Sequence, residues 1–232
     1  MRVGVVGAGI SGLVCARRLQ ELVGRVEGSV KLQLSVLEWG RGPGGRTARR
    51  RIRVPTADGS GESIEVSFDH ASPYFGARTS EFKDGLLATW QASGWANPWA
   101  VAASREEAEQ GVETWVGVPS NHAIARSLAS EIQTCGAAMH YGTHVKEAKC
   151  DDGVWQVTTS RRDTAEEQIL SFDALVLSDK LLVLPNRHYP DLLPDPRPPT
   201  NLNRSTGILC FIRRSGGRSW RRSPVGSAHG VP

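Results

Sequence analysis

Three glycines near the start of the chain are spaced as Gly-x-Gly-x-x-Gly, at Gly7, Gly9 and Gly12. An apolar run, Val3–Val6, precedes them, and a helical pattern, Leu13–Leu22, follows. In this order of strand, tight turn and helix, the spacing is typical of a dinucleotide-binding loop. The helix N-terminus offers unpaired N–H groups and a partial positive charge to phosphates. We therefore predict that a dinucleotide is bound by the following residues: Gly7, Ala8, Gly9, Ile10, Ser11 and Gly12.

A second feature is the acidic residue Glu38, which ends a predicted strand, Leu32–Glu38. In a Rossmann unit an acid at this place accepts hydrogen bonds from the adenosine ribose. Glu38 follows Gly12 at somewhat more than the usual spacing of about 20 residues, and the linker 24–31 accounts for the excess. The alternative is a solvent-exposed glutamate without a ligand. The glycine motif before it favours ribose binding.

The segment after Glu38, Gly40–Thr47, is rich in glycine, and by composition alone it predicts a loop. Its position makes it more specific. A glutamate followed by five residues and Gly-Gly-Arg, after a Gly-x-Gly-x-x-Gly unit, resembles the second fingerprint of flavin-containing amine oxidases. The resemblance implies that the paired glycines lie against FAD and that arginine lies near its phosphates, which suits a guanidinium group. The cofactor residues that it adds are Trp39, Arg41, Gly44, Gly45 and Arg46.

Further segments resemble the renalase-like flavoproteins. Phe68–Phe75 is similar to a family segment that passes close to the flavin ring, although Ala71 and Ser72 replace the usual Gly and Ala. Within this segment His70 has two interpretations, a catalytic base or a structural or surface histidine. We assign no catalytic residue.

The segment Trp115–Glu131 resembles another stretch of the same family, with Ser120 and Asn121 in place of the usual Gly and Met. The resemblance also implies that Val145 contacts the adenine of FAD through its backbone. The motifs follow one another in family order over residues 3–184.

The expected fold class is α/β, a Rossmann-like FAD- or NAD(P)-binding domain with a parallel central sheet and a β-meander, plus an incomplete α+β substrate domain. Turn and periodicity signals define the elements. The expected strands are 49–54, 63–68, 113–118, 139–141, 143–149, 154–159, a returning strand within 170–180, and 207–212. The expected helices after the first are 81–93 and 123–132.

We assign residues 1–80 and 113–184 to the FAD-binding domain and residues 81–112 and 185–212 to the partial substrate domain. Six prolines between positions 185 and 199 indicate a linker or loop there. Residues 213–232, rich in Arg, Ser and Gly, are expected to be a disordered basic tail. Since family members continue well beyond this length, we expect a truncated chain.

Charge and hydropathy limit the expected partners. The net charge of +4 is misleading, because eight arginines and only two aspartates follow Asn186, which leaves residues 1–186 at −2. We therefore expect no nucleic acid on the folded part; the alternative, in which the arginine-rich tail binds one, predicts strongly salt-dependent binding. No apolar run approaches the roughly 20 residues of a membrane helix, so no membrane is expected. We expect a soluble intracellular protein, and the resemblance also allows a plastid.

The cysteines and a group of tryptophans are expected to have structural and not catalytic roles. Cys15, Cys135, Cys150 and Cys210 are scattered without metal-ligand spacing, which favours reduced structural thiols and no metal. Four tryptophans concentrate between Trp90 and Trp115. They form either an aromatic wall for a substrate or packing in the core, and we favour packing.

The resemblance implies an FAD-dependent oxidoreductase with a small-molecule substrate, an amine or a reduced nicotinamide-like compound, whose hydride passes to the flavin and then to oxygen. Two alternatives remain. One is an NAD(P)-binding reductase, because the glycine motif with Glu38 also suits that cofactor. The other is a truncated, non-catalytic dinucleotide-fold module.

Overall fold

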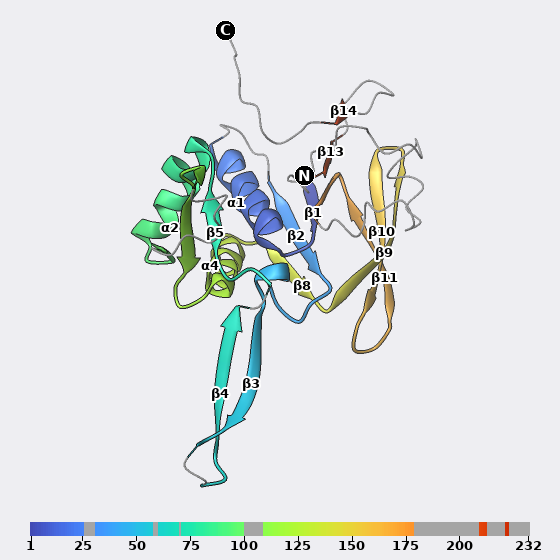
Figure 1. The fold of residues 1–232 in the computed structure, drawn as a ribbon. Coiled ribbons are helices and arrows are strands. Elements are labelled where there is room, and N and C mark those ends of the chain that lie inside the picture. The colour runs from blue at the N-terminus through green and yellow to red at the C-terminus, as the bar shows by residue number, and fades with distance from the viewer. Residues whose placement is uncertain are drawn as a thin grey trace. The chain divides into compact units, whose positions relative to one another are not determined.

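A computed structural model gives the fold of the chain (Figure 1). It describes residues 1–25, 31–57, 60–69, 71–99, 109–178, 209–212 and 221–222. The chain divides into two compact units. The first unit comprises Met1–Pro43 and Leu128–Pro232, and the second comprises Gly44–Ser127.

The first unit is built on a six-stranded sheet. Its parallel strands are β1 (Arg2–Val6), β2 (Gln33–Glu38), β8 (Ala138–Tyr141) and β12 (Ala174–Leu177). Two strands continue it in antiparallel pairing, β13 (Leu209–Ile212) and β14 (Arg221–Arg222). The strand order is β14-β13-β12-β1-β2-β8. Apolar side chains of β1, β2 and β12 are almost wholly buried, as is usual for parallel strands covered on both faces.

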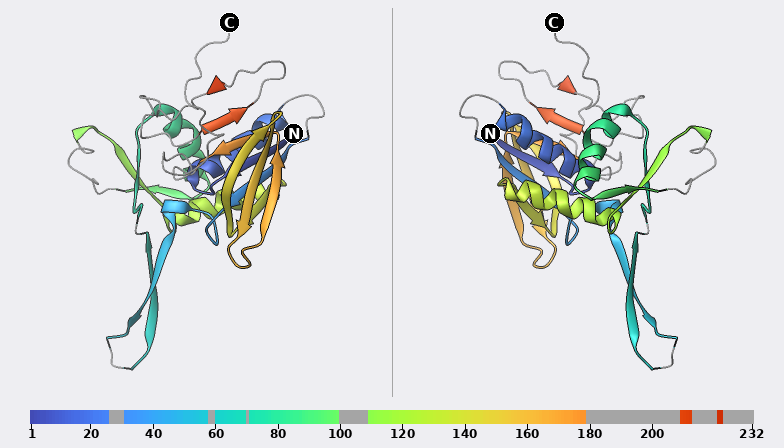
Figure 2. Two further views of the ribbon diagram at one scale, coloured as in Figure 1. Left: turned by 90° about the vertical axis from the view of Figure 1, so that its right-hand side faces the viewer. Right: turned by 90° about the vertical axis from the view of Figure 1, so that its left-hand side faces the viewer.

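Different elements cover the two faces of this sheet (Figures 1 and 2). Helix α1 (Ile10–Gly24) lies on one face and buries Gly12, Leu13 and Ala16. The other face carries an antiparallel meander of β9 (Thr143–Asp151), β10 (Val154–Arg161) and β11 (Glu167–Phe172). The core between sheet and meander is a single cluster, consisting of Val6, Leu37, Val145, Ala148, Trp155, Val157, Phe172, Leu175 and Leu177.

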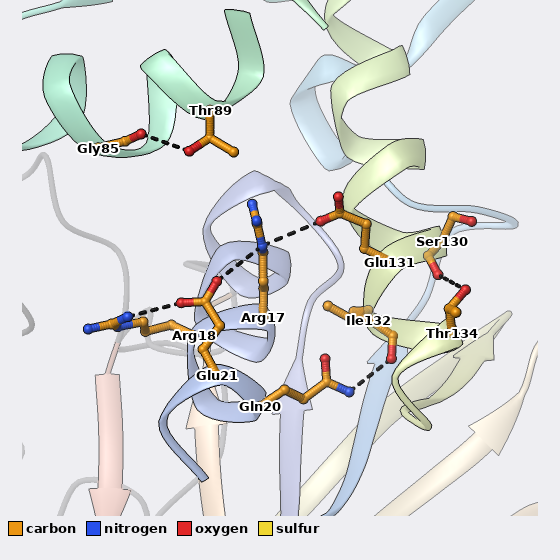
Figure 3. A network of polar contacts seen from close by, with 10 residues as sticks. All are labelled: Arg17, Arg18, Gln20, Glu21, Gly85, Thr89, Ser130, Glu131, Ile132 and Thr134. Carbon is orange, nitrogen blue, oxygen red and sulfur yellow. Dashed lines mark hydrogen bonds and ion pairs between the residues drawn. The ribbon is translucent and has the colours of Figure 1, made fainter. Parts of the chain in front are cut away.

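Polar contacts join α1 to the C-terminal part of α4 (Asn121–Thr134), as Figure 3 shows. The Gln20 carboxamide donates to the carbonyl oxygens of Ile132 at 2.9 Å and Cys135 at 3.1 Å. These carbonyls lie at a helix end, where no intrahelical donor remains for them. The Arg17 guanidinium pairs with Glu131 of α4 at 3.4 Å. The helix that follows the glycine motif is therefore tied to a second helix through its exposed side.

The second unit contains two small sheets. Strands β3 (Arg49–Pro55) and β4 (Ser63–Asp69) form an antiparallel hairpin, drawn as a long ribbon in Figures 1 and 2. Strands β5 (Phe75–Ala77), β7 (Glu113–Gly117) and β6 (Ala96–Pro98) form the other sheet in the order β5-β7-β6. The short helices are η1 (Gly45–Thr47), η2 (Phe82–Leu87) and α2 (Ala88–Ala92).

Two of the second unit's tryptophans, Trp90 and Trp115, lie in its core, whereas Trp99 is 44% exposed. Trp90 is 3% exposed and Trp115 is 7% exposed. The Trp90 ring meets Phe75 and Phe82 edge to face, with ring centroids 6.1 Å and 5.8 Å away. This geometry is favourable for aromatic pairs. The interpretation as core packing is confirmed for Trp90 and Trp115.

The predicted fold class is confirmed, with a parallel central sheet and a meander. Three elements differ from their predicted form. The expected helix 81–93 begins with a π-helical stretch, η2, before α2. The strand at 138–141 joins the central sheet beside β2, a placement that the sequence does not give. The expected returning strand within 170–180 is two strands, β11 and β12, separated by Asp173.

Asp173 separates these strands because it is bonded to the start of the chain. Its carboxylate accepts the Arg2 backbone N–H at 2.7 Å and the Arg2 guanidinium at 2.9 Å. Its own N–H donates to the Arg2 carbonyl at 2.8 Å. These bonds align β12 with β1, and only Ala174–Leu177 return to the sheet.

Several expectations concern the remaining residues. Cys15, Cys135 and Cys150 are not in disulfide bonds, whereas the side chain of Cys210 is not among those described. Strand β13 lies in the first unit's sheet, whereas residues 185–212 were predicted to belong to a substrate domain. Strand β14 falls within the tail that was expected to be disordered. The partition into a cofactor domain and a substrate domain stays a prediction. No helix in the described part of the chain has the length and hydropathy to cross a membrane.

Candidate dinucleotide site

The glycine loop between β1 and α1 is tightly constrained by its own backbone. Gly7 has φ +100°, a conformation that side chains disfavour, and its N–H donates to the Leu37 carbonyl at 2.8 Å. A Cβ on Gly12 would lie 2.0 Å from the Gly7 carbonyl oxygen. Both glycines are thus required by the protein itself, Gly7 by the tight turn and Gly12 by the close approach of α1 to the loop.

The N-terminus of α1 has the properties of a phosphate site. The helix begins at Ile10, and its first intrahelical bond runs from the Leu13 N–H to the Gly9 carbonyl at 3.0 Å. The N–H groups before Leu13 have no intrahelical acceptor. No side chain caps this end, and no acidic residue lies in the first turn. Neither a side-chain cap nor an acid in its own first turn therefore offsets the partial positive charge of α1.

Gly9 differs from the other two glycines of the motif. A Cβ built on it meets no atom of the described residues within 4 Å, and its φ of −71° suits any residue. The absence of a side chain at this position is therefore not required by the fold. It keeps the space in front of the α1 N-terminus open, which a bound pyrophosphate needs.

Glu38 is connected to the glycine loop at the end of β2. One carboxylate oxygen accepts the Ala8 N–H at 2.7 Å, and the other accepts the Gly40 N–H at 2.6 Å. A carboxylate has about four lone-pair sites, so each oxygen retains capacity to accept a ribose hydroxyl. Of the predicted site residues, Glu38 and Ala8 are thus in direct contact.

Sequence reasoning missed Ser178, which closes the loop from the other side. Its hydroxyl bonds to the carbonyl oxygens of Val6 and Gly7, both at 2.9 Å, and its N–H donates to Val6. It follows directly on β12, which is paired with β1. The sequence does contain a signal for Ser178, since it follows the apolar run 174–177. Parallel strands end at the same edge of a sheet, so a polar residue directly after such a strand can reach the glycine loop after β1.

Aromatic side chains follow the ends of β2 and β8. The Trp39 ring is 50% exposed and lies 3.9 Å, centroid to centroid, from the His144 ring at an angle of 48°. Tyr141 is the register partner of Glu38, and burial together with the Glu38 charge raises its pKa. Burial and the nearby Arg161 charge lower the pKa of His140. At neutral pH Tyr141 is therefore an uncharged phenol beside the Glu38 carboxylate.

Val145 is placed differently from the other candidates. Its side chain is 4% exposed within the core of the first unit, and its register partner is Thr159 of β10. The side chain faces the core, and the predicted contact of the Val145 backbone with adenine stays a prediction. Arg41 is exposed in the loop after β2.

The Gly-Gly-Arg sequence lies in the second unit, at η1. Gly44 has φ +125° and Gly45 has φ +53°, so both adopt backbone conformations that favour glycine. A Cβ on Gly44 would lie 2.9 Å from Cδ2 of His122. Arg46 is exposed. The geometry explains both glycines through the backbone, while contact with a flavin stays a prediction.

Asn121 connects the two middle segments that carry the resemblance. It is 2% exposed; its carboxamide accepts the Gly117 N–H at 2.6 Å and donates to the Ser72 carbonyl at 2.7 Å. Its own N–H donates to the Asp69 carboxylate at 2.7 Å. The departure from the family's methionine at this position therefore has a structural role here. His70 lies outside the described residues.

The comparisons with known proteins agree with this geometry. Residues 5–92 match the model of the NAD(P)-binding Rossmann-like domain. The first unit has this fold. No curated protein sequence matches the chain. Within the part of the chain that the structure describes, no three His, Cys, Asp or Glu residues gather as a metal site requires.

Three solved structures illustrate what the chain is similar to. BexE, studied for oxidation during BE-7585A biosynthesis, is 22% identical with a TM-score of 0.48, over 76% of this chain and 31% of that one. The flavin-dependent monooxygenase PieE, solved with FAD and substrate, is 16% identical with a TM-score of 0.43. The match covers 75% of this chain and 30% of PieE. A flavoprotein/dehydrogenase from Cytophaga hutchinsonii is 14% identical with a TM-score of 0.46. The match covers 81% of this chain and 41% of that protein. The chain spans less than half the length of each.

Proposed function

We propose that this chain binds FAD and belongs to a renalase-like, flavin-containing amine oxidase type of oxidoreductase. The observation that carries the proposal is the joined arrangement of the open α1 N-terminus and the Glu38 carboxylate, 2.7 Å from the Ala8 N–H. The first would hold the pyrophosphate and the second the adenosine ribose. This arrangement suits any adenine dinucleotide.

The choice of FAD depends on the sequence between positions 38 and 46. Glu38, the loop that follows it and the Gly-Gly-Arg at 44–46 resemble the flavin fingerprint rather than a nicotinamide one. The roles proposed for Trp39, Arg41, Arg46 and Val145 rest on the same resemblance. When bound, FAD would supply the hydride acceptor for an amine or a reduced nicotinamide-like substrate.

The chain's own contribution is binding and electrostatics. The α1 N-terminus would stabilise phosphate charge, and Gly9 would leave the space in front of it free. Glu38 would orient the ribose while it holds the glycine loop to the turn after β2. These groups fix one end of the cofactor and take no part in the transfer of a proton.

The experiment is a titration of the purified chain with FAD, NADH and NADPH, followed by anaerobic addition of an amine or a dihydronicotinamide. We expect FAD to bind most tightly and its visible absorbance to be lost when the substrate reduces it. Binding of FAD without reduction by either class would favour the non-catalytic module. Preference for NADH or NADPH would favour the reductase, and no binding of any dinucleotide would overturn the proposal.

A further inference from the structure

The large exposed aromatic surface beside Glu38 has no role in the fold described so far. Trp39 follows Glu38 directly, and half of its surface is exposed. Burial of a tryptophan ring contributes strongly to stability, so a half-exposed ring at the ligand-binding edge of a sheet leaves a contact surface unused by the fold. Its neighbour is the His144 ring, 3.9 Å away.

The backbone around the two rings holds them together. The Gly142 N–H donates to the Gly40 carbonyl at 2.9 Å, which joins the turn after β2 to the turn after β8. Trp39 precedes Gly40, and His144 follows Gly142 by two positions. The Gly142 carbonyl in turn accepts the Arg162 N–H at 2.8 Å. The ring pair is therefore carried by a connected backbone and not by a free loop.

The ring pair lies where the base of a nucleotide bound at Glu38 would be expected. A purine is attached directly to the ribose, so it must lie within one sugar ring of the groups that hold the ribose hydroxyls. Glu38 is such a group, and Trp39 is its next residue. Aromatic rings are the usual surfaces on which proteins stack nucleobases. Tyr141, opposite Glu38 in the register, adds a polar hydroxyl beside the same strand end.

We propose that Trp39 and His144 together form the surface against which the adenine base stacks. This inference rests on the proposed function only as far as an adenine nucleotide binds at Glu38, and it does not depend on FAD in particular. It assigns the base contact to two side chains, in addition to the backbone of Val145. His144 has no motif of its own in the sequence.

The experiment compares ADP with ribose 5-diphosphate, which lacks the base, by calorimetric titration of the full chain. We expect Trp39→Ala and His144→Ala each to weaken ADP binding about tenfold, in the lower part of the range for stacking of a base on an aromatic ring. Binding of ribose 5-diphosphate should stay unchanged. Trp39→Phe retains a ring and should bind ADP within about threefold of the wild type.

Each outcome decides between the two proposals. If the wild type binds FAD and ADP while the Trp39→Ala and His144→Ala variants bind ADP equally well, the stacking surface is refuted and the proposed function stands. If ADP binding depends on both rings but NADH is preferred to FAD, the stacking surface stands and the proposed function fails. If the wild type binds no adenine nucleotide, both fail. Loss of ribose 5-diphosphate binding in the ring variants would also refute the stacking role.

Discussion

Substitution of two glycines of one motif should separate folding from binding. In Gly12→Ala the new Cβ would lie 2.0 Å from the Gly7 carbonyl oxygen and 2.5 Å from the Ser178 hydroxyl. The first of these is a backbone atom, so α1 must move away from β1. Overpacking of this kind, together with weakened Ser178 bonds, should lower the free energy of unfolding by about 3 kcal/mol.

Gly9→Ala is the matched control, because in the described part of the chain its Cβ meets no atom within 4 Å. At an N-cap alanine is less favourable than glycine by roughly 0.5–1 kcal/mol. The reduced freedom of the unfolded chain offsets about 0.4–1 kcal/mol, so stability should stay within about 0.5 kcal/mol of the wild type. ADP binding should nevertheless be lost, since the methyl group would occupy the phosphate's space. The assay is urea unfolding, followed by titration of each folded variant with ADP.

Two results would refute this reasoning. Equal stabilities of Gly12→Ala and the wild type would mean that the close approach of α1 to the loop is not a constraint of the fold. Normal ADP binding by Gly9→Ala would mean that the phosphates do not lie in front of the α1 N-terminus.

Three further predictions concern the stability of the scaffold. The Arg2 N–H and guanidinium lower the pKa of Asp173, so its contribution is present above the ordinary carboxyl range and is lost as pH falls through the lowered value. Asp173→Asn should therefore cost about 0.5 kcal/mol at pH 6 for this partly exposed pair, and progressively less as pH falls below the ordinary carboxyl range, by urea unfolding. Gln20→Ala removes the Gln20 donor from the Cys135 carbonyl and one of two donors from the Ile132 carbonyl, which keeps the Ala137 N–H at 3.0 Å. The loss should cost about 1 kcal/mol in thermal unfolding, whereas an unchanged Tm would contradict the cap. Ile64 on the hairpin is 55% exposed, so Ile64→Thr should change stability by less than about 0.5 kcal/mol, and a larger loss would show that its face is covered.

The parts of the fold that sequence could predict are those carried by local spacing. Gly7, Gly9 and Gly12 define the turn from β1 to α1, and the acid at position 38 marks the end of β2. Each of these features depends on a few neighbouring residues, so it can be recognised from the residue types and their spacing. The hairpin β3–β4 was predictable for the same reason, from its alternation and its glycine-rich turn.

The parts that sequence could not predict depend on pairings between distant segments. Strand β8 lies beside β2 through backbone bonds alone, and four residues at 138–141 do not specify a neighbour. Ser178 reaches the glycine loop only because β12 is next to β1. Asp173 ends β11 through bonds to Arg2 at the other end of the chain. In each case the partner is about 100 or more positions away, and no local rule identifies it.

Amide NMR tests the central claim most directly, because it reports where on the chain a nucleotide binds. Upon titration of the uniformly labelled chain with ADP, we predict that the largest saturable shift changes occur at the amides of residues 9–12 and at Ala8, whose N–H donates to Glu38. These are the groups at the open end of α1. Shift changes confined to other residues, or none at saturating ADP, would contradict the account.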